Sequence, residues 1–310
     1  MNFAARVRRP EYAAASALVA LLVGNAVLTP HFATTGNLWN VLLQVSPVLL
    51  AAVGMTFVIA TGGVDLSVGS TMAISGAIAA VLIDRGPVVA VIAALIGGCL
   101  VGALNGSLIG SLRVQPIVVT LATLIAGRGL AQIISHDGEL VTVSDSAFLA
   151  LGRGSAGPVP GPVVIALLAV AFATLVLRAT AFGRYVLAVG GNRAAARLAG
   201  VPARRTIVMV YVASGCLAAV AGLIAAARLG ASDAAKIGQN MELDAIAAVV
   251  VGGTALSGGR ATIGGTVVGA LMMQVIATSF NMLLVPYAWS LAIKAAIILV
   301  AVYLQRPARA

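Results

Sequence analysis

The stretch TGGVDLSVGS, Thr61–Ser70, decides how this chain is interpreted, because it places a carboxylate between two long apolar runs. The run MTFVIA precedes it and AISGAIAAVL follows soon after, so Asp65 lies where two membrane-length segments meet. A charge in lipid is costly and is tolerated at a junction or in a protein-lined cavity. The stretch therefore predicts a polar loop with a specific role in a membrane protein.

The overall composition also indicates a membrane protein. Of 310 residues, 61% are hydrophobic and 9% are charged, whereas soluble domains carry about 25% charged residues. In a soluble domain the net charge of +10 would suggest a nucleic-acid partner. In this apolar chain the basic residues are better interpreted by where they lie relative to the membrane, so we expect lipid around the protein and no nucleic-acid partner. Cys99 and Cys216 lie in apolar runs, and no disulfide framework is implied.

Runs of about 20 apolar residues are long enough to cross a bilayer as helices. We predict an all-α integral membrane protein, a polytopic bundle of about ten transmembrane helices that forms a single transmembrane domain over residues 1–310. The expected spans are 12–29, 38–60, 67–83, 87–111, 115–135, 162–178, 207–228, 243–258, 263–284 and 288–305.

The placement of basic residues predicts the orientation, since cytoplasmic loops retain Lys and Arg. With the N-terminus inside, most arginines fall in inner segments, and the outer segments hold only Arg85, Arg153, Arg228 and Lys236. Acidic residues collect in the outer segments instead: Asp84, Asp137, Glu139, Asp145, Asp233 and Glu242. Both termini are therefore predicted to be cytoplasmic.

Two connecting loops are long, an outer one at about 136–161 and an inner one at about 179–206. In the inner loop, Gly190 and Gly191 are expected to break the chain, Asn192 to cap a helix over RAAARLA, and Gly200 to stop it. Arg193 and Arg197 are spaced i, i+4, which predicts a cationic helix presented to the cytoplasm. The alternative is that these arginines only determine topology.

An internal echo relates Gly62-Gly63-x-x-Leu66-Ser67-x-Gly69 to a second copy 190 residues later, in which Ala255 replaces Asp65. Duplicated halves are common in transporters, although matches dominated by glycine also arise by chance. We interpret the two copies as paired turns that act as a gating or assembly hinge near the cytoplasmic boundary. The residues assigned to it are Gly62, Gly63, Asp65, Ser67, Gly69, Gly252, Gly253, Ser257 and Gly259.

Small residues also predict a helix contact. Gly98, Gly102, Gly106 and Gly110 recur at every fourth position of one apolar run. Such a ridge lets a neighbouring helix approach closely.

The motifs of common enzymes are absent from the sequence. No GxxxxGK[ST] phosphate loop precedes Lys236 or Lys294, so any ATP must be bound by another chain. His31 and His136 have no partners at metal-ligand spacing, and no serine lies in a GxSxG elbow. We expect a protein without catalytic residues, bound metal or cofactor of its own.

Neutral amides stand in several apolar runs, where polar groups face the bundle interior or a water-filled path. Amides can hydrogen-bond the hydroxyl groups of a sugar, which makes them candidates for the translocation path. The alternative is that each amide joins two helices. The candidates are Asn105, Gln132, Gln274 and Asn281.

Three long stretches resemble one family. AVGMTFVIATGGVDLSVGS, AVGGNRAAARLAGV and ELDAIAAVVVGGTALSGGRATIGGTVVGAL are similar, in this order, to the permease subunits of ABC importers for ribose, arabinose, xylose and galactose. The resemblance covers nearly the whole chain from about Ala51. Within the group, PIVVTLATLIAGRGLAQII and GELVTV look most like galactofuranose-type permeases.

The resemblance implies a monosaccharide importer in a bacterial cytoplasmic (inner) membrane. Its expected partners are a cytoplasmic ABC ATPase that holds ATP and Mg²⁺, a periplasmic sugar-binding protein, and a second permease subunit in a homodimer or heterodimer. The segment Gly191–Val201 matches the region that contacts the ATPase. The residues expected to couple to it are Asn192, Arg193, Ala195, Ala196, Arg197, Leu198 and Gly200.

The alternative function is an ATP-independent secondary transporter or channel for small polar solutes. That class usually carries carboxylates, Arg or His at a coupling-ion site within the membrane. The central runs of this chain hold few ionisable groups, which disfavours proton coupling.

Overall fold

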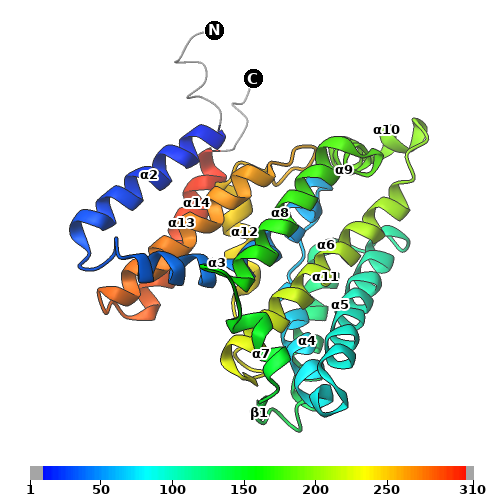
Figure 1. The fold of residues 1–310 in the computed structure, drawn as a ribbon. Coiled ribbons are helices and arrows are strands. Elements are labelled where there is room, and N and C mark those ends of the chain that lie inside the picture. The colour runs from blue at the N-terminus through cyan, green and yellow to red at the C-terminus, as the bar shows by residue number, and fades with distance from the viewer. Residues whose placement is uncertain (1–9, 305–310) are drawn as a thin grey trace.

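The computed structural model describes residues 10–304, which form a helical bundle (Figure 1). The first half contains α2 (Pro10–Leu28), α3 (Thr35–Ala60), α4 (Val68–Leu82), the 3₁₀ helix η1 (Ile83–Arg85), α5 (Pro87–Gly110) and α6 (Pro116–Ile134). Between the halves lie β1 (Val141–Thr142), α7 (Ser146–Arg153), β2 (Ser155–Ala156) and β3 (Val159–Pro160). The rest contains α8 (Gly161–Ala179), α9 (Ala181–Gly191), α10 (Arg193–Leu198), α11 (Ala203–Leu229), β4 (Ala231–Ser232), α12 (Met241–Val251), α13 (Ile263–Met282) and α14 (Tyr287–Leu304).

Seven helical segments of the described part are long and apolar enough to cross a membrane: α3, α4 with η1, α5, α6, α8, α11 and α13. The apolar stretches counted in α2 and α14 are shorter, Ala14–Leu28 and Ala288–Ile297. The expected span 243–258 is wrong in its length. Its helix, α12, has 11 residues and is about 16 Å long, roughly half of the hydrocarbon core. The helix ends at Gly252, and Gly253, at φ 88°, turns the chain after it.

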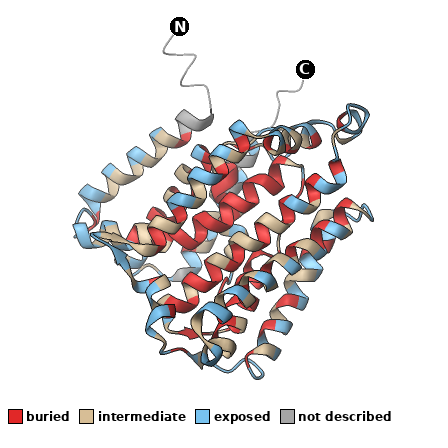
Figure 2. Cartoon of the chain, turned by 45° about the vertical axis from the view of Figure 1, so that its right-hand side comes forward, coloured by how far each residue is buried: buried red, intermediate tan, exposed pale blue. Residues whose placement is uncertain are grey.

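Helix α11 lies at the centre of the bundle and packs against α3, α4 and α5. The predicted glycine ridge of α5 makes one of these contacts. A Cβ at Gly102 would overlap the carbonyl oxygen of Tyr211, and one at Gly106 would lie 2.7 Å from the Cα of Val208. The close helix approach predicted from the ridge is therefore confirmed, and α11 is the partner. Figure 2 shows the buried residues concentrated in the central helices.

Two groups of four helices repeat the same packing pattern. In α3–α6 the second and third helices pack together, as they do in α11–α14. Helix α11 packs on α4 and α5, and α3 packs on α12 and α13. The two long helices are antiparallel, since Arg228 donates to the carbonyl of Leu43 while Gly54 abuts Ser214. Each long helix thus packs on the second and third helices of the other group, which makes α3 equivalent to α11. The sequence echo instead relates the end of α3 to the end of α12, so it does not correspond to this structural repeat.

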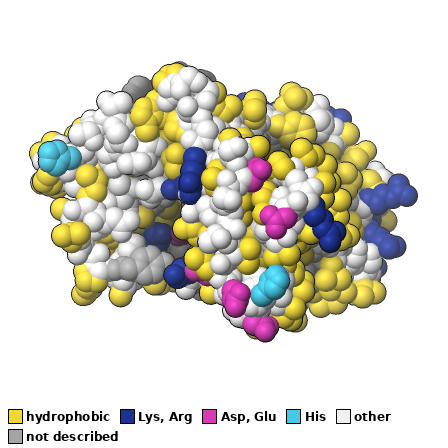
Figure 3. All heavy atoms as spheres, turned by 60° about the horizontal axis from the view of Figure 1, so that its bottom comes forward, with side chains coloured by type: hydrophobic (Ala, Val, Ile, Leu, Met, Phe, Trp, Pro, Cys, Tyr) yellow, Lys and Arg dark blue, Asp and Glu magenta, His cyan; other side chains and the backbone are white. Residues whose placement is uncertain are grey.

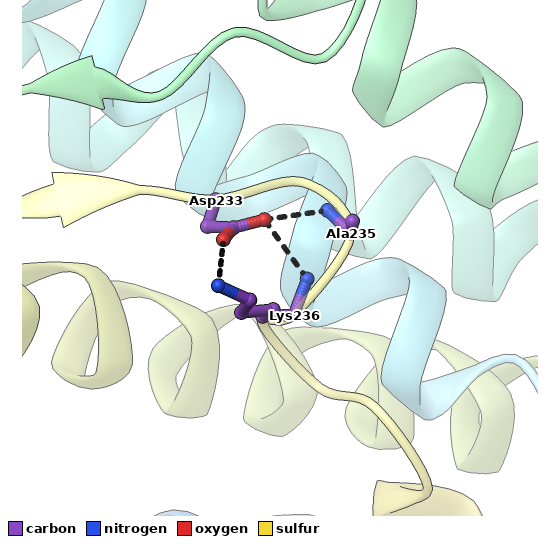
Figure 4. Close-up of polar contacts among 3 residues, drawn as sticks. All are labelled: Asp233, Ala235 and Lys236. Carbon is purple, nitrogen blue, oxygen red and sulfur yellow. Dashed lines mark hydrogen bonds and ion pairs between the residues drawn. The ribbon is translucent and has the colours of Figure 1, made fainter.

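The long loops lie at opposite ends of the bundle. Helix α10 is at the end where α2 begins and α14 finishes, whereas β1 and α7 are at the other end (Figure 1). At that other end, β1 pairs with β4 in antiparallel register, Val141 opposite Ser232. Asp233 stabilises a turn in the segment between β4 and α12. Its Oδ1 accepts hydrogen bonds from the backbone N–H groups of Ala235 and Lys236 (Figure 4).

Candidate functional site

Asp65 lies in the loop between α3 and α4 and is 1% exposed. Its Oδ1 accepts hydrogen bonds from the backbone N–H of Ser67 at 3.0 Å and from the Ser67 hydroxyl at 2.6 Å. Its Oδ2 accepts from the hydroxyl of Ser214, on α11, at 2.8 Å. Both carboxylate oxygens are therefore paired, which is the condition for burying such a group.

The hydrogen bonds continue from Ser67 into two further helices. Asn105, on α5, donates to the Ser67 hydroxyl at 2.9 Å, and Thr123, on α6, donates to the amide oxygen of Asn105 at 2.7 Å. Asn105 is completely buried. Residues Asp65, Ser67, Asn105, Thr123 and Ser214, here called the polar node, join the loop to α5, α6 and α11.

The other amides proposed for a translocation path do not join the polar node. Gln274, on α13, donates to the side-chain oxygen of Gln44, on α3, at 2.9 Å. Gln132 and Asn281 are exposed on α6 and at the end of α13. The structure does not bring the four candidates together, and Asn105 and Gln274 join helices, as the alternative interpretation expected.

The two glycine turns have the same local geometry, shifted by one residue from the sequence echo. After α3, the N–H of Gly62 donates to Ile59 and that of Gly63 to Val58; after α12, Gly253 donates to Val250 and Thr254 to Val249. This is the Schellman pattern that ends helices with a residue at positive φ. That residue is Gly62 (φ 81) in the first turn and Gly253 (φ 88) in the second.

The first turn and the loop after the second are bonded to each other beneath α9. The N–H of Gly259 donates to the carbonyl of Ala60 at 2.9 Å, and Gly258 abuts Gly62. Gly190 packs on this contact, and a Cβ there would overlap the carbonyl oxygen of Ala60. We call Ala60, Gly62, Gly190, Gly258 and Gly259 the glycine junction.

The expectation that Gly190 and Gly191 break the chain is wrong, because both lie in α9. The break comes at Asn192, whose φ of −158° and ψ of 104° leave the helical region. Gly190 is needed for close packing and not for a turn. A Cβ at Gly191 would have nothing within 4 Å, so that position shows no such requirement.

The predicted capped helix is confirmed as α10. The side-chain oxygen of Asn192 accepts from the backbone N–H groups of Ala194 and Ala195, both at 3.0 Å. Gly200 follows the helix at φ 80°. Ala196 faces the bundle at 5% exposure, whereas Leu198 is 92% exposed. Leu198 therefore projects from the surface of this six-residue helix.

The two arginines of α10 do not serve the same surface. Arg197 is exposed, but Arg193 donates to the carbonyl of Gly110, at the end of α5, at 3.0 Å. Burial lowers the pKa of Arg193, and the neighbouring charges of Arg197 and Arg113 lower it further, although arginine stays charged. The expectation of one outward cationic face is therefore wrong for Arg193, which bonds α10 to α5.

Sequence reasoning missed Ser214, Thr123 and Tyr211. Ser214 and Thr123 belong to the polar node, and Tyr211, which is completely buried, donates to the carbonyl of Val64 at 3.3 Å. A polar residue inside an apolar run is the only sequence signal for these positions. That signal does not identify the hydrogen-bond partner of each residue. Ser214 and Asp65, for example, are 149 residues apart in the sequence.

A bundle of membrane-length helices with a buried polar loop and a capped, exposed helix at one end is consistent with an integral membrane permease. Residues 37–302 match the family described as the permease component of branched-chain amino acid transport systems. The match covers most of the chain, and the protein belongs to this family.

Several similar proteins are named as sugar permeases. The galactofuranose transporter permease of Escherichia coli K12 is 41% identical over 93% of this chain and 87% of that protein. The ribose import permease of the same organism is 41% identical over 92% and 91%, and the L-arabinose permease of Azospirillum brasilense is 38% identical over 89% and 82%. The expected resemblance to monosaccharide permeases is thus confirmed. No solved structure matches the chain.

Proposed function

We propose that this chain is the membrane-spanning subunit of an ATP-driven, binding-protein-dependent importer of a monosaccharide, a pentose or hexose such as ribose or galactofuranose. Relatives named for galactofuranose, ribose and arabinose support the cargo class. In this proposal both termini and α10 face the cytoplasm of a bacterium, and α2, α12 and α14 complete about ten membrane segments.

The structure of helix α10 is the observation that best supports the proposed coupling to an ATPase. It is capped at Asn192, it exposes Arg197 and 92% of Leu198, and it is bonded to the bundle through Arg193 and Gly110. A rigid, partly apolar projection of this kind transmits a displacement better than a flexible loop. ATP and Mg²⁺ would be held by the partner ATPase, a soluble sugar-binding protein would dock at the end carrying α7, and a second permease subunit would complete the passage.

Uptake should require all the partners at once. We expect vesicles that contain this permease, its cognate ATPase and its binding protein to accumulate one labelled sugar from a panel of ribose, arabinose, galactofuranose and fructose only when ATP is supplied on the side of the ATPase. Leaving out the ATPase or the binding protein should abolish accumulation. Uptake that persists without ATP would instead favour a secondary transporter or channel.

The structure separates the expected effects of the two α10 arginines. Arg197→Glu places a negative charge on the exposed surface, so we expect sugar uptake to fall by about tenfold or more, equivalent to about 1.4 kcal/mol of lost contact, while the melting temperature is unchanged. Arg193→Gln removes the bond to Gly110 and should lower both uptake and the melting temperature.

Uptake, ATP hydrolysis and thermal unfolding of each purified variant separate these outcomes. Arg205→Glu, an equal charge reversal at an exposed position on α11, is the control. Normal uptake by Arg197→Glu would show that α10 does not contact the ATPase through this residue.

A further inference from the structure

Four charged side chains lie together on helices that are otherwise apolar. Arg128 is on α6, Glu242 and Asp244 begin α12, and Lys294 is in the middle of α14. These four residues are called the charged quartet. None is among the four amides selected from the sequence as candidates for the translocation path.

Lys294 and Asp244 form a close ion pair, with Nζ and Oδ1 2.7 Å apart. The side chains are 13% and 25% exposed, so the pair is reached from outside the chain without being fully solvated. It joins α14 to α12 across a contact between these helices. Lys294 lies in the middle of α14. Charged side chains at such positions of a membrane helix face the interior of the bundle or a water-filled cavity and not the lipid.

Arg128 and Glu242 meet beside Gly69, at the start of α4. A Cβ at Gly69 would lie 2.5 Å from Glu242 Oε2 and 3.4 Å from Arg128 Nη2. Arg128 Nη1 donates to the carbonyls of Ala234 and Ile237, at 3.2 and 2.5 Å, which holds the guanidinium against the segment before α12. The absence of a side chain at Gly69 thus makes room for both charges.

Glu242 carries an oxygen that the fold does not satisfy. Its Oε2 atom is buried, and within the described part of the chain it has no hydrogen-bond partner. Leaving a buried acceptor unpaired is costly, so such an atom calls for an explanation. A hydroxyl group arriving from a solute would satisfy it.

The quartet has two positive and two negative groups, and its formal charge is zero. A site with this balance has no net charge that would favour a cation over an anion, and its carboxylates can accept from hydroxyl groups while its guanidinium and ammonium can donate to them. Figure 3, which views the end bearing β1 and α7, shows basic and acidic side chains beside a hollow in that face. The chemistry fits an uncharged, hydroxyl-rich solute.

We propose that the charged quartet lines the translocation passage and that Glu242 Oε2 accepts a hydroxyl group of the passing sugar. The proposal rests on the proposed function for the identity of the solute, whereas the placement of the quartet on a water-filled passage can be tested without it. The passage then runs along the face formed by α6, the start of α12 and α14. The competing explanation is that the quartet only holds these helices together.

Cysteine accessibility tests the lining of the passage. In a chain with Cys99→Ala and Cys216→Ala, we would introduce Asp244→Cys or Glu242→Cys and measure modification by a charged methanethiosulfonate in membranes. Leu100→Cys on α5 and Phe172→Cys on α8, at positions 64% and 68% exposed, are controls for surfaces that face lipid. Modification at 244 and 242 should be at least about tenfold faster than at the controls, because a charged reagent does not enter hydrocarbon.

A folding check keeps this experiment decisive. Each variant is first shown to elute as a monodisperse species in detergent, and Asp244→Cys serves if Glu242→Cys does not fold. Modification at control rates in a folded variant would overturn the proposal and leave the quartet as a helix contact. If the passage is lined as proposed, prior modification should also reduce uptake by the assembled importer about tenfold or more.

The contribution of Glu242 to sugar binding has its own measurement. In the importer with its ATPase and binding protein, Glu242→Gln should lower uptake and change the ratio of ribose to arabinose transport, while the melting temperature stays close to wild type. Asp84→Asn, at an exposed position in η1, is the matched carboxylate change and should leave that ratio unchanged. An unchanged ratio for Glu242→Gln would overturn its role in binding.

The two proposals fail in different ways. If wild-type vesicles take up sugar without ATP, the importer assignment fails, and fast modification at 244 still places the quartet in a water-filled passage. If uptake needs ATP but both cysteines react at control rates, the importer stands and the charged quartet does not line its passage.

Discussion

Gly190→Ala is expected to destabilise the protein by about 2–3 kcal/mol and to abolish sugar uptake, because a methyl group there overlaps the carbonyl oxygen of Ala60. The neighbouring atoms belong to backbone, from Ala60 and Gly259, and backbone cannot rotate away as a flexible side chain does. The substitution should separate α9 from the glycine junction. The effect is read as a lower melting temperature of the purified chain and as lost uptake in vesicles.

Gly191→Ala is the matched control, one residue further along the same helix. Nothing lies within 4 Å of a Cβ at this position, and we expect a stability within about 1 kcal/mol of wild type. The comparison removes helix propensity as an explanation, since both changes are from glycine to alanine in α9. Equal melting temperatures for the two variants would show that the glycine junction does not require Gly190.

Asp65→Ala is expected to cost about 3 kcal/mol of stability, because it leaves buried hydroxyl groups of Ser67 and Ser214 without their acceptor. Asp65→Asn should cost about 1 kcal/mol, since the remaining oxygen still accepts and the serine hydroxyls can rotate. Thermal unfolding of the two variants gives the stabilities. Uptake by the Asn variant then tests whether the charge itself is needed in the proposed hinge.

Asp84→Ala provides the control for this series, because Asp84 is exposed in η1, at the far end of the helix that follows the loop. Its stability should lie within about 0.5 kcal/mol of wild type. If Asp65→Ala were no less stable than Asp84→Ala, the polar node would not hold α11 to the loop. Wild-type uptake by Asp65→Asn would show that hydrogen bonding, and not negative charge, is the contribution of Asp65.

The features that were predicted well depend on residues close together in the chain. Hydrophobic runs predicted most of the membrane-length helices, since length and polarity alone set that property. Asn192 and Gly200 bracket α10, because a cap acts on N–H groups two and three residues away. The spacing of Gly98 to Gly110 predicted a close helix contact on α5 for the same reason.

The sequence by itself thus determined the protein class, most spans, the capped helix and the family. Only the tertiary structure decided that α12 is a short helix, that Arg193 bonds to α5, and that the glycine turns meet beneath α9. It also paired Asp65 with Ser214 and gathered the charged quartet from three helices. These outcomes depend on which distant segments pack against each other. An apolar helix with one polar residue could pack against many different helices equally well. Packing selects among them, because a buried polar group must find a partner wherever the bundle places it.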